Sequence, residues 1–515
     1  MIADGGRGGT LQDRLAILQA ISLATLAVLP GFLIGAMAPR IRAEFGFGPA
    51  GLGLAVAWFF IATGIAAPIL GQVADRLDSR MALVIGALMT GVALTGIGMA
   101  PQYVWLLVAL TVGGLANALS QPAVNASLSR SIPAGHLGLA IGIKQSAIPA
   151  ATLLGGLAVP TLGVSLGWRG TFVVAGMVAV LGGVVLRLAG KPGEQRMRAP
   201  RRRLRESQPE LRSLFILTLG GTFGAAAATS LGAFLVDAAV DGGIAEIRAG
   251  LIAASASAAG LLSRVGLGWW ADRHPVSSRY RTISLALLLG SPGFLLLATG
   301  TSPAYVIGAL LAYVLGWGWT GLFHYTVVSQ NPTAPAASTG VIQTGLSLGA
   351  GLGPLVLGNV AERTSYPTAW VTASILSLVG ALLFEIGRRH LRRARARGAQ
   401  PTDPPRLPQE VHWGANRARL LAEGVSSSDH AGEGRAITLL QLAPCYSWRS
   451  RSGTDAIVLF VMQGEQADLA VGGVAHRQRA GDALTLPANV IWTARNGGGD
   501  DLVLALVRGE MVSTS

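Results

Sequence analysis

The sequence predicts an all-α membrane protein of twelve transmembrane helices in two pseudo-symmetric six-helix halves, followed by a small all-β C-terminal domain. Three observations predict this fold. Of the 515 residues 51% are hydrophobic and 13% charged, whereas a soluble chain carries about 25% charged residues. A landmark of glycine and charged residues recurs in the second half of the chain. After residue 397 the long apolar runs give way to short, alternating ones.

Apolar runs near the roughly 20 residues that cross a bilayer as a helix occur twelve times before residue 390. The first half, 12–190, is predicted to hold spans near 15–38, 50–71, 81–100, 103–128, 138–160 and 169–190. The second half, 213–390, is predicted to hold spans near 213–236, 248–270, 282–300, 304–328, 339–361 and 368–387.

The repeated landmark lies between the second and third spans of each half. It contains Gly71, Asp75, Arg76 and Arg80 in the first half and Gly268, Asp272 and Arg273 in the second. Its offset is 268 − 71 = 197 residues, and a second pair, Gln145 and Gln343, gives an offset of 198. Two unrelated landmarks that share one offset indicate a duplicated unit of several helices.

The net charge of +14 lies beside the predicted spans, so we expect a lipid-bilayer surface and no nucleic acid as its partner. The positive-inside rule places the basic linker 191–212, the basic and proline-containing linker 391–410 and both termini in the cytoplasm. Arginine supplies 38 of the 40 cations, which suggests a GC-rich bacterial genome and therefore a bacterial inner membrane. The single cysteine, Cys445, excludes an intrachain disulfide.

The first landmark matches a G-x-x-x-D-R-x-x-x-R signature, and over residues 12–390 the chain resembles the major facilitator superfamily. The second landmark matches the weaker echo of this signature, with Arg279 two residues late. The resemblance implies a transporter that works by alternating access.

The landmark residues also have a physical reading as a gate. Gly71 would let helix backbones approach closely, and Asp75 would meet the positive dipole end of span eleven near Thr339. By pseudo-symmetry Asp272 would meet the start of span five near Leu137. Arg76 and Arg130 would hold the two aspartates in place.

Two charges inside the spans are the first candidates for substrate contact, because intramembrane charges are costly and usually functional. Lys144 lies about six residues into span five, and Arg264 lies about eight residues from the inner end of span eight. Their repeat positions hold Ile342 and Ala67, so the fold requires neither cation. No acid near mid-membrane neutralises them, which favours an anionic substrate. The alternative is that either side chain extends toward the membrane face.

Six uncharged side chains complete the predicted substrate contacts: Asn117, Gln121, Gln145, His324, Tyr325 and Gln343. Asn117 and Gln121 share one face of span four and either line the cavity or bond neighbouring helices. Gln145 and Gln343 are repeat mates with either a binding or a packing role. His324 is a candidate for binding or for proton transfer, since no membrane carboxylate is evident as a proton carrier.

Residues 411–515 resemble a cupin, a jelly-roll barrel. Gly481, Pro487 and Asn496 fit the second cupin motif, but Trp492 stands where cupins place a metal-binding histidine. In the first motif the two histidines are missing, and Ile457 takes the glutamate position. The resemblance therefore implies a barrel without a metal or another cofactor. Trp448 and Trp492 would either line a small-molecule pocket or fill the core.

The sequence thus predicts a secondary transporter of a small organic anion with a cytoplasmic cupin-like domain that senses a ligand or regulates transport. The Gly142–Ser146 and Trp168–Arg169 regions look similar to bacterial carriers of small organic anions, including cyanate-type and monocarboxylate-type carriers. Two alternatives stay open: a transporter fused to a catalytic cupin enzyme, and a membrane receptor that does not transport. We predict no catalytic residues, and the sequence does not define the oligomeric state.

Overall fold

The computed structural model describes residues 11–131, 137–188, 208–274, 276–330 and 335–398, together with ten strands and some of their connections between residues 417 and 508. The chain divides into two compact units, which we describe separately: a helical unit up to residue 388, and a unit of strands after it. Most of the predicted linkers 191–212 and 391–410 lies outside the described residues.

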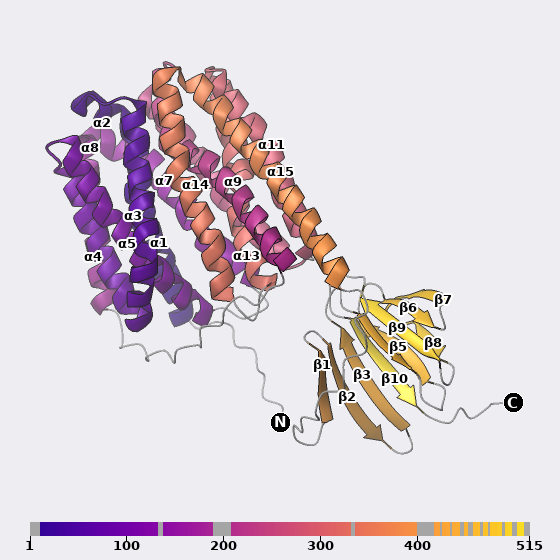
Figure 1. The fold of residues 1–515 in the computed structure, drawn as a ribbon. Helices are drawn as coiled ribbons and strands as arrows, with labels where there is room; N and C mark the ends of the chain where they lie inside the picture. The colour runs from indigo at the N-terminus through magenta and orange to yellow at the C-terminus, as the bar shows by residue number, and fades with distance from the viewer. Residues whose placement is uncertain are drawn as a thin grey trace. The chain divides into compact units, whose positions relative to one another are not determined.

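The helical part consists of long α-helices, some interrupted by π-helical turns (Figure 1). In the first half these are α1 Leu11–Ala36, α2 Ala38–Phe45, α3 Pro49–Arg76, α4 Ser79–Gly98, α5 Tyr103–Ser131, α6 Leu137–Gln145, α7 Ala147–Ala158, the π-helix η2 Val159–Gly163 and α8 Val164–Leu188. In the second half they are α9 Gln208–Asp241, α10 Glu246–Ala271, α11 Val276–Ala298, α12 Ser302–Leu311, the π-helix η3 Ala312–Gly316, α13 Thr320–Gln330, α14 Pro335–Arg363 and α15 Tyr366–Gly398.

The described residues contain ten helical segments long and apolar enough to cross a membrane, or eleven if the bent pair α1–α2 is one span. One of the ten, Gly138–Leu188, has 51 residues. At 1.5 Å per residue it would measure about 76 Å, more than twice the roughly 30 Å of a bilayer core. Gly167 leaves the helical conformation inside this segment, with φ at +69°. Divided there, the segment supplies two spans, and the described helices account for the twelve that were predicted.

Three of the predicted spans are not continuous helices. The first bends by 65° at Met37, between α1 and α2. The fifth breaks at Ser146, between α6 and α7. The tenth consists of α12, η3 and α13, with residues 317–319 outside any helix. Hydropathy did not predict these breaks, because it reports how apolar a run is and not whether its helix is continuous.

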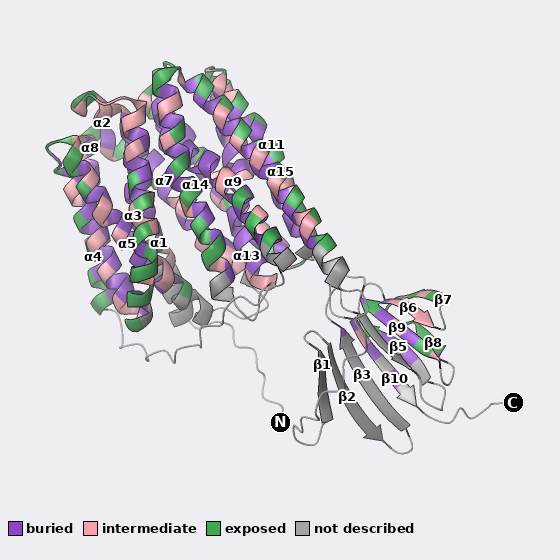
Figure 2. Ribbon diagram, viewed as in Figure 1, coloured by how far each residue is buried: buried purple, intermediate pink, exposed green. Residues whose placement is uncertain are grey.

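Small residues bring the two halves together. A Cβ on Gly35 of α1 would lie 2.6 Å from the carbonyl oxygen of Ala233 in α9. A Cβ on Gly358 of α14 would lie 3.2 Å from the Cα of Gly53 in α3. Only residues without a bulky side chain permit such approaches in a membrane bundle. Figure 2 shows buried and exposed residues alternating around these helices.

The two ends of the helical unit receive names that are used below. The motif end holds the connections from α3 to α4 and from α10 to α11, which carry the repeated landmark. The ion-pair end holds α2 and the connection from α9 to α10, residues 242–245.

The C-terminal unit is all β, as predicted. Its strands are β1 Arg417–Ala422, β2 Val425–Gly432, β3 Arg435–Leu442, β4 Ser447–Arg451, β5 Ile457–Gln463, β6 Ala467–Val471, β7 Val474–Gln478, β8 Ala483–Leu486, β9 Ile491–Asn496 and β10 Leu502–Arg508. They form two antiparallel sheets in the orders β1-β2-β3-β10-β5-β8 and β4-β9-β6-β7. In β9 the buried Trp492 and Ala494 alternate with the exposed Ile491 and Arg495, the period of a strand with one face in a core.

Candidate functional site

Arg264 is buried, and its guanidinium donates hydrogen bonds to backbone carbonyls. The side chain is 1% exposed in α10. Its guanidinium donates to the carbonyl oxygen of Gln145, the last residue of α6, and to that of Trp317 at 3.2 Å. It also lies 5.5 Å from the centre of the Trp317 ring. Both carbonyls belong to breaks in helices, where a cation is favoured by the exposed ends of the peptide dipoles.

The prediction that Arg264 and Lys144 are two unpaired cations facing one cavity is therefore wrong for Arg264. Sequence reasoning counted only acids as partners, and it did not foresee that two interrupted helices would present carbonyls at mid-helix.

Lys144 differs from Arg264. It is partly buried in the last turn of α6. Within the described part of the chain, no hydrogen-bond or ion-pair partner of its ammonium is found. The next residue along the chain, Gln145, contacts His324. Lys144 is thus the better placed of the two predicted cations to meet a ligand.

His324 joins the repeat-mate glutamines across the two halves. Its side chain is 5% exposed in α13. Its Nδ1 lies 3.0 Å from Nε2 of Gln145 in α6 and 2.9 Å from the carbonyl oxygen of Thr320. Its Nε2 lies 3.2 Å from Oε1 of Gln343 in α14. Gln343 in turn donates to Oγ of Ser347 at 3.3 Å.

These contacts fit one neutral tautomer without moving either amide. With its proton on Nε2, the His324 ring donates to Gln343 Oε1, and its Nδ1 accepts from Gln145 Nε2. The other neutral tautomer donates from Nδ1 to the Thr320 carbonyl and requires both glutamine amides to be turned. The orientation of the two amides is therefore linked to the tautomer of His324.

The polar residues of span four serve helix packing in part. Asn117 is 5% exposed and donates to Thr63 Oγ1 of α3 at 3.4 Å, and Gln121 donates to Asn117 Oδ1 at 3.1 Å. Of the two roles left open for Asn117, the hydrogen bond to a neighbouring helix is the one observed. Gln121 is partly exposed.

At the motif end, Asp272 binds the first turn of α6. Its Oδ1 accepts from the backbone N–H of Gly138 at 2.7 Å, and its Oδ2 accepts from that of Leu139 at 2.9 Å. These are free N–H groups of a helix start, where a carboxylate is favoured. The contact links the two halves where the sequence placed it, while its role as a gate stays a prediction.

The two landmark glycines differ in their surroundings. A Cβ on Gly268 would lie 2.5 Å from the Gly138 carbonyl oxygen and 3.2 Å from the Gly142 Cα. A Cβ on Gly71 would meet no atom within 4 Å beyond its own helix. The close approach expected at Gly71 is thus absent in this structure, and it occurs at the repeat mate.

Two basic residues of the landmark bond the last turns of helices. Arg80 donates to the carbonyl of Leu186 at 3.0 Å, and Arg273 donates to the carbonyl of Trp269 at 3.0 Å. Arg76 is exposed. Arg279 is 6% exposed, donates to the carbonyl of Ala271 at 2.8 Å and lies 4.4 Å from the centre of the Tyr325 ring.

Tyr325 lies beside Asp272: a Cβ on Gly138 would meet both of their side chains. It therefore belongs to the motif end and not with His324, although the sequence grouped the two as substrate contacts. The side chains of Asp75 and Arg130 lie outside the described residues.

The seam between α3 and α14 changes along its length. At the ion-pair end a Cβ on Gly358 would lie 2.6 Å from the Pro49 carbonyl oxygen. Further along, a Cβ on Gly351 would lie 3.5 Å from the Ile61 side chain. Toward the motif end, Gly71 and Gly340 would meet nothing within 4 Å beyond their own helices. The two helices are packed at one end and apart at the other.

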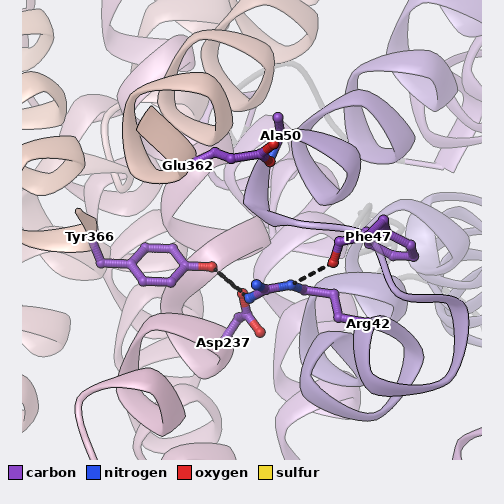
Figure 3. Close-up of polar contacts among 6 residues, drawn as sticks. All are labelled: Arg42, Phe47, Ala50, Asp237, Glu362 and Tyr366. Carbon is purple, nitrogen blue, oxygen red and sulfur yellow. Dashed lines mark hydrogen bonds and ion pairs between the residues drawn. The ribbon is translucent and has the colours of Figure 1, made fainter. Parts of the chain in front are cut away.

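The ion-pair end holds a charged cluster that sequence reasoning missed (Figure 3). Asp237 of α9 is 3% exposed and accepts from the Arg42 guanidinium of α2 and from the Tyr366 hydroxyl of α15. Glu362 of α14 accepts from the backbone N–H of Ala50 at 2.7 Å. In the sequence, Asp237 directly follows the predicted span 213–236. The uneven distribution of charges in the connections, cations after span one and acids after span seven, was the available signal.

In the β unit, Trp492 is 2% exposed and packs among the leucines of the core. This position favours the filled-core alternative over the pocket. Trp448 lies in β4, opposite Ala494, and its side chain lies outside the described residues. Among the described residues there is no group of three or more His, Cys, Asp or Glu side chains that could hold a metal ion.

Comparison with known proteins agrees with this architecture. The model of the Major Facilitator Superfamily matches residues 19–344. An uncharacterized MFS-type transporter of Mycobacterium tuberculosis is 25% identical over 328 residues, covering 61% of this chain and 72% of that protein. The tetracenomycin C resistance and export protein of Streptomyces glaucescens is 24% identical over 187 residues, covering 36% of this chain and 34% of that protein.

Solved structures show the same fold. A bacterial homolog of the human lysosomal transporter Spinster, in an inward-facing and occupied conformation, has a TM-score of 0.59 and 19% identity, covering 75% of this chain and 99% of that one. Its unoccupied conformation has a TM-score of 0.57. The family match spans well over half of the chain, and the twelve-span count and the repeated landmark agree with it. The chain therefore belongs to the major facilitator superfamily, a family of multi-pass membrane transporters and not of enzymes.

Proposed function

We propose that this chain is a secondary transporter that moves a small organic anion across the bacterial inner membrane by alternating access, with the motif end in the cytoplasm. The seam between α3 and α14 carries the alternating-access part of the proposal. It is packed around Gly53 and Gly358 and opens toward Gly71 and Gly340. Such a seam leaves a path open on one side of the membrane and closed on the other. Because the open side is the motif end, which we place in the cytoplasm, the structure corresponds to an inward-facing state.

The other end of the same two helices suggests how the second state forms. The faces of α3 and α14 that lie apart carry small residues, Gly64 and Gly71 on α3 and Gly340 on α14. Residues of this size allow helix backbones to approach closely. We infer that these faces meet when the motif end closes, and Asp75 then reaches the start of α14 as Asp272 already reaches the start of α6.

Lys144 supports an anionic substrate. A lysine costs up to roughly 2.5–3.5 kcal/mol to insert into a membrane helix, the value for the helix centre, and Lys144 is retained inside span five without a partner among the described residues. An anion at its ammonium would offset that cost by a charge-assisted hydrogen bond. We therefore propose Lys144 as the one cation that contacts the anion, because Arg264 already donates to two carbonyls. Gln343, which is exposed near His324, is available to complete the site.

The test is uptake of a panel of small organic acids into proteoliposomes. Lys144→Gln should weaken binding of the anion by roughly 1.5–3 kcal/mol, the range for hydrogen bonds to charged groups. Lys144→Arg should weaken binding less. Arg187→Gln removes an equal charge from an exposed position in the last turn of α8 and should leave affinity unchanged. A neutral or cationic substrate, or normal affinity in Lys144→Gln, would refute the anion site. The direction of flux decides between import and the export for which one relative is named.

For the C-terminal unit we propose a cytoplasmic, cupin-like domain that regulates transport. Its two antiparallel sheets and its apolar core support a folded domain. The absence of the cupin ligand residues from the sequence argues against the catalytic alternative. The full-length protein should therefore purify without stoichiometric iron, zinc, manganese or nickel, and metal analysis that finds about one ion per chain would revive the fused enzyme.

A further inference from the structure

The contacts at the ion-pair end divide by charge between the two halves. In the described carboxylate contacts between the halves at this end, the first half supplies the donor and the second half the carboxylate. Arg40 holds Glu246 with two parallel hydrogen bonds of 2.7 and 3.0 Å. Arg42 is paired with Asp237, and the backbone N–H of Ala50 donates to Glu362. Three carboxylates of the second half are therefore bonded to the first half at this end, and Arg42 also donates to the Tyr366 hydroxyl at 3.2 Å.

The Arg42–Asp237 pair is the buried member of this set. The Asp237 side chain is 3% exposed, whereas the Glu246 side chain is 24% exposed. The charge of a buried carboxylate depends on its partners far more than that of an exposed one. The strength of the ion-pair end is therefore expected to depend mainly on this pair.

Each side of the pair is held in place by its own half. Arg42 Nε donates to the Phe47 carbonyl at 3.3 Å, within the first half. Asp237 accepts from the Tyr366 hydroxyl, within the second half. Figure 3 shows the tyrosine and the arginine meeting the aspartate from opposite sides. Within this group, separation of the halves would break the contacts of Arg42 with Asp237 and Tyr366. The bonds of Arg42 to Phe47 and of Tyr366 to Asp237 would leave both partners positioned to re-form them.

The duplication does not explain these charges. Arg40 and Asp237 share a repeat position, since 40 + 197 = 237, and they carry opposite charges. The fold therefore requires neither sign at this place.

We propose that Arg42, Asp237 and Tyr366 form a lock that holds the ion-pair end closed and that they act as gating residues of the transport cycle. The inference rests on the alternating-access proposal. Opening this end requires Arg42 to leave Asp237, so the lock sets the population of the state that opens there. Tyr366 is a positioning residue, because it keeps the carboxylate in place when the arginine leaves.

The test measures distances between spin labels in the full chain after Cys445→Ser. Gln102→Cys and Ser302→Cys report on the ion-pair end, and Leu188→Cys and Arg281→Cys report on the motif end. All four positions are exposed and lie outside the lock. Asp237→Asn should raise the population with the ion-pair end apart roughly ten- to a hundred-fold, the factor expected from losing a hydrogen bond between charged groups. Tyr366→Phe should give a smaller rise.

Two further variants separate the lock from general effects of charge. Arg42→Asp combined with Asp237→Arg should return the distances toward those of the parent. Glu44→Gln removes the Glu44–Arg169 ion pair, which lies within the first half, and should change neither distance. If Asp237→Asn folds poorly, Arg42→Gln tests the same contact from its more exposed side.

The outcomes distinguish this inference from the proposed function. If the parent exchanges between two motif-end distances and neither Asp237→Asn nor Arg42→Gln shifts them, the lock is refuted and alternating access stands. If Asp237→Asn opens the ion-pair end while the motif end stays fixed, the lock is supported and alternating access fails.

Discussion

The two landmark glycines give the sharpest prediction, since they occupy the same motif position and have opposite surroundings. We expect Gly268→Ala to destabilise the protein and Gly71→Ala not to. The new Cβ at position 268 would lie 2.5 Å from the Gly138 carbonyl oxygen and 3.1 Å from its carbon. The first distance is below the 3.0 Å that real Cβ contacts respect, and the neighbour is backbone, so α6 and α10 must move apart.

Overpacking of this kind costs about 1–3 kcal/mol. At 2–4 °C per kcal/mol for a large domain, the apparent melting temperature should fall by about 2–12 °C. The same movement also pulls the Gly138 and Leu139 N–H groups away from Asp272. At position 71 the Cβ would meet open space. Alanine in place of glycine within a helix stabilises the folded protein by roughly 0.5–1 kcal/mol.

The assay is thermal unfolding of the two variants in the same detergent, with Gly266→Ala as a matched control. Gly266 lies two residues before Gly268 in α10, and its Cβ would meet nothing within 4 Å. The reasoning fails if Gly268→Ala melts with the parent, or if Gly266→Ala and Gly71→Ala lose as much stability as it does.

Three further predictions follow from other parts of the chain. Arg264→Lys should lower stability by about 1–3 kcal/mol in thermal unfolding, because one ammonium cannot serve both carbonyls; unchanged stability would contradict this role. Asp75→Asn should slow transport at saturating substrate more than it weakens binding, and a steep loss of affinity at a normal maximal rate would exclude a gate. Trp492→Ala should destabilise the β unit by about 3–5 kcal/mol in denaturant unfolding, while Met462→Ala, at a 62% exposed position, should not. Equal losses in the last two variants would mean that the core is assigned wrongly.

The fold could be predicted from the sequence because it follows from the lengths of the apolar runs and from the internal repeat. Apolar runs report how much helix must lie in lipid, and the offset between Gly71 and Gly268 reports the duplication. The contact of Asp272 with the start of α6 followed from the same repeat, since a carboxylate at the end of one span has few partners other than the start of a neighbouring one.

The helix breaks and the partners of the buried charged residues could not be predicted in this way. Arg264 looked unpaired because its partners are carbonyls, which every residue has and no pattern marks. From the sequence alone, Asp237 is expected to lie in water at the end of a span. Its partner, Arg42, lies on a helix that turns by 65° after Met37. The pair joins residues 195 positions apart and depends on that turn, which the length of an apolar run does not report.

The setting of Arg264 has a consequence for the order in which the protein is made. Span eight enters the membrane before span ten has been synthesised, so the Trp317 carbonyl does not yet exist when the guanidinium inserts. The Gln145 carbonyl, at the break in span five, is then the partner already available from the first half. An arginine at a helix centre costs roughly 2.5–3.5 kcal/mol to insert. We expect insertion of the second half to depend on a first half already assembled beside it, so that biogenesis runs in one direction along the chain.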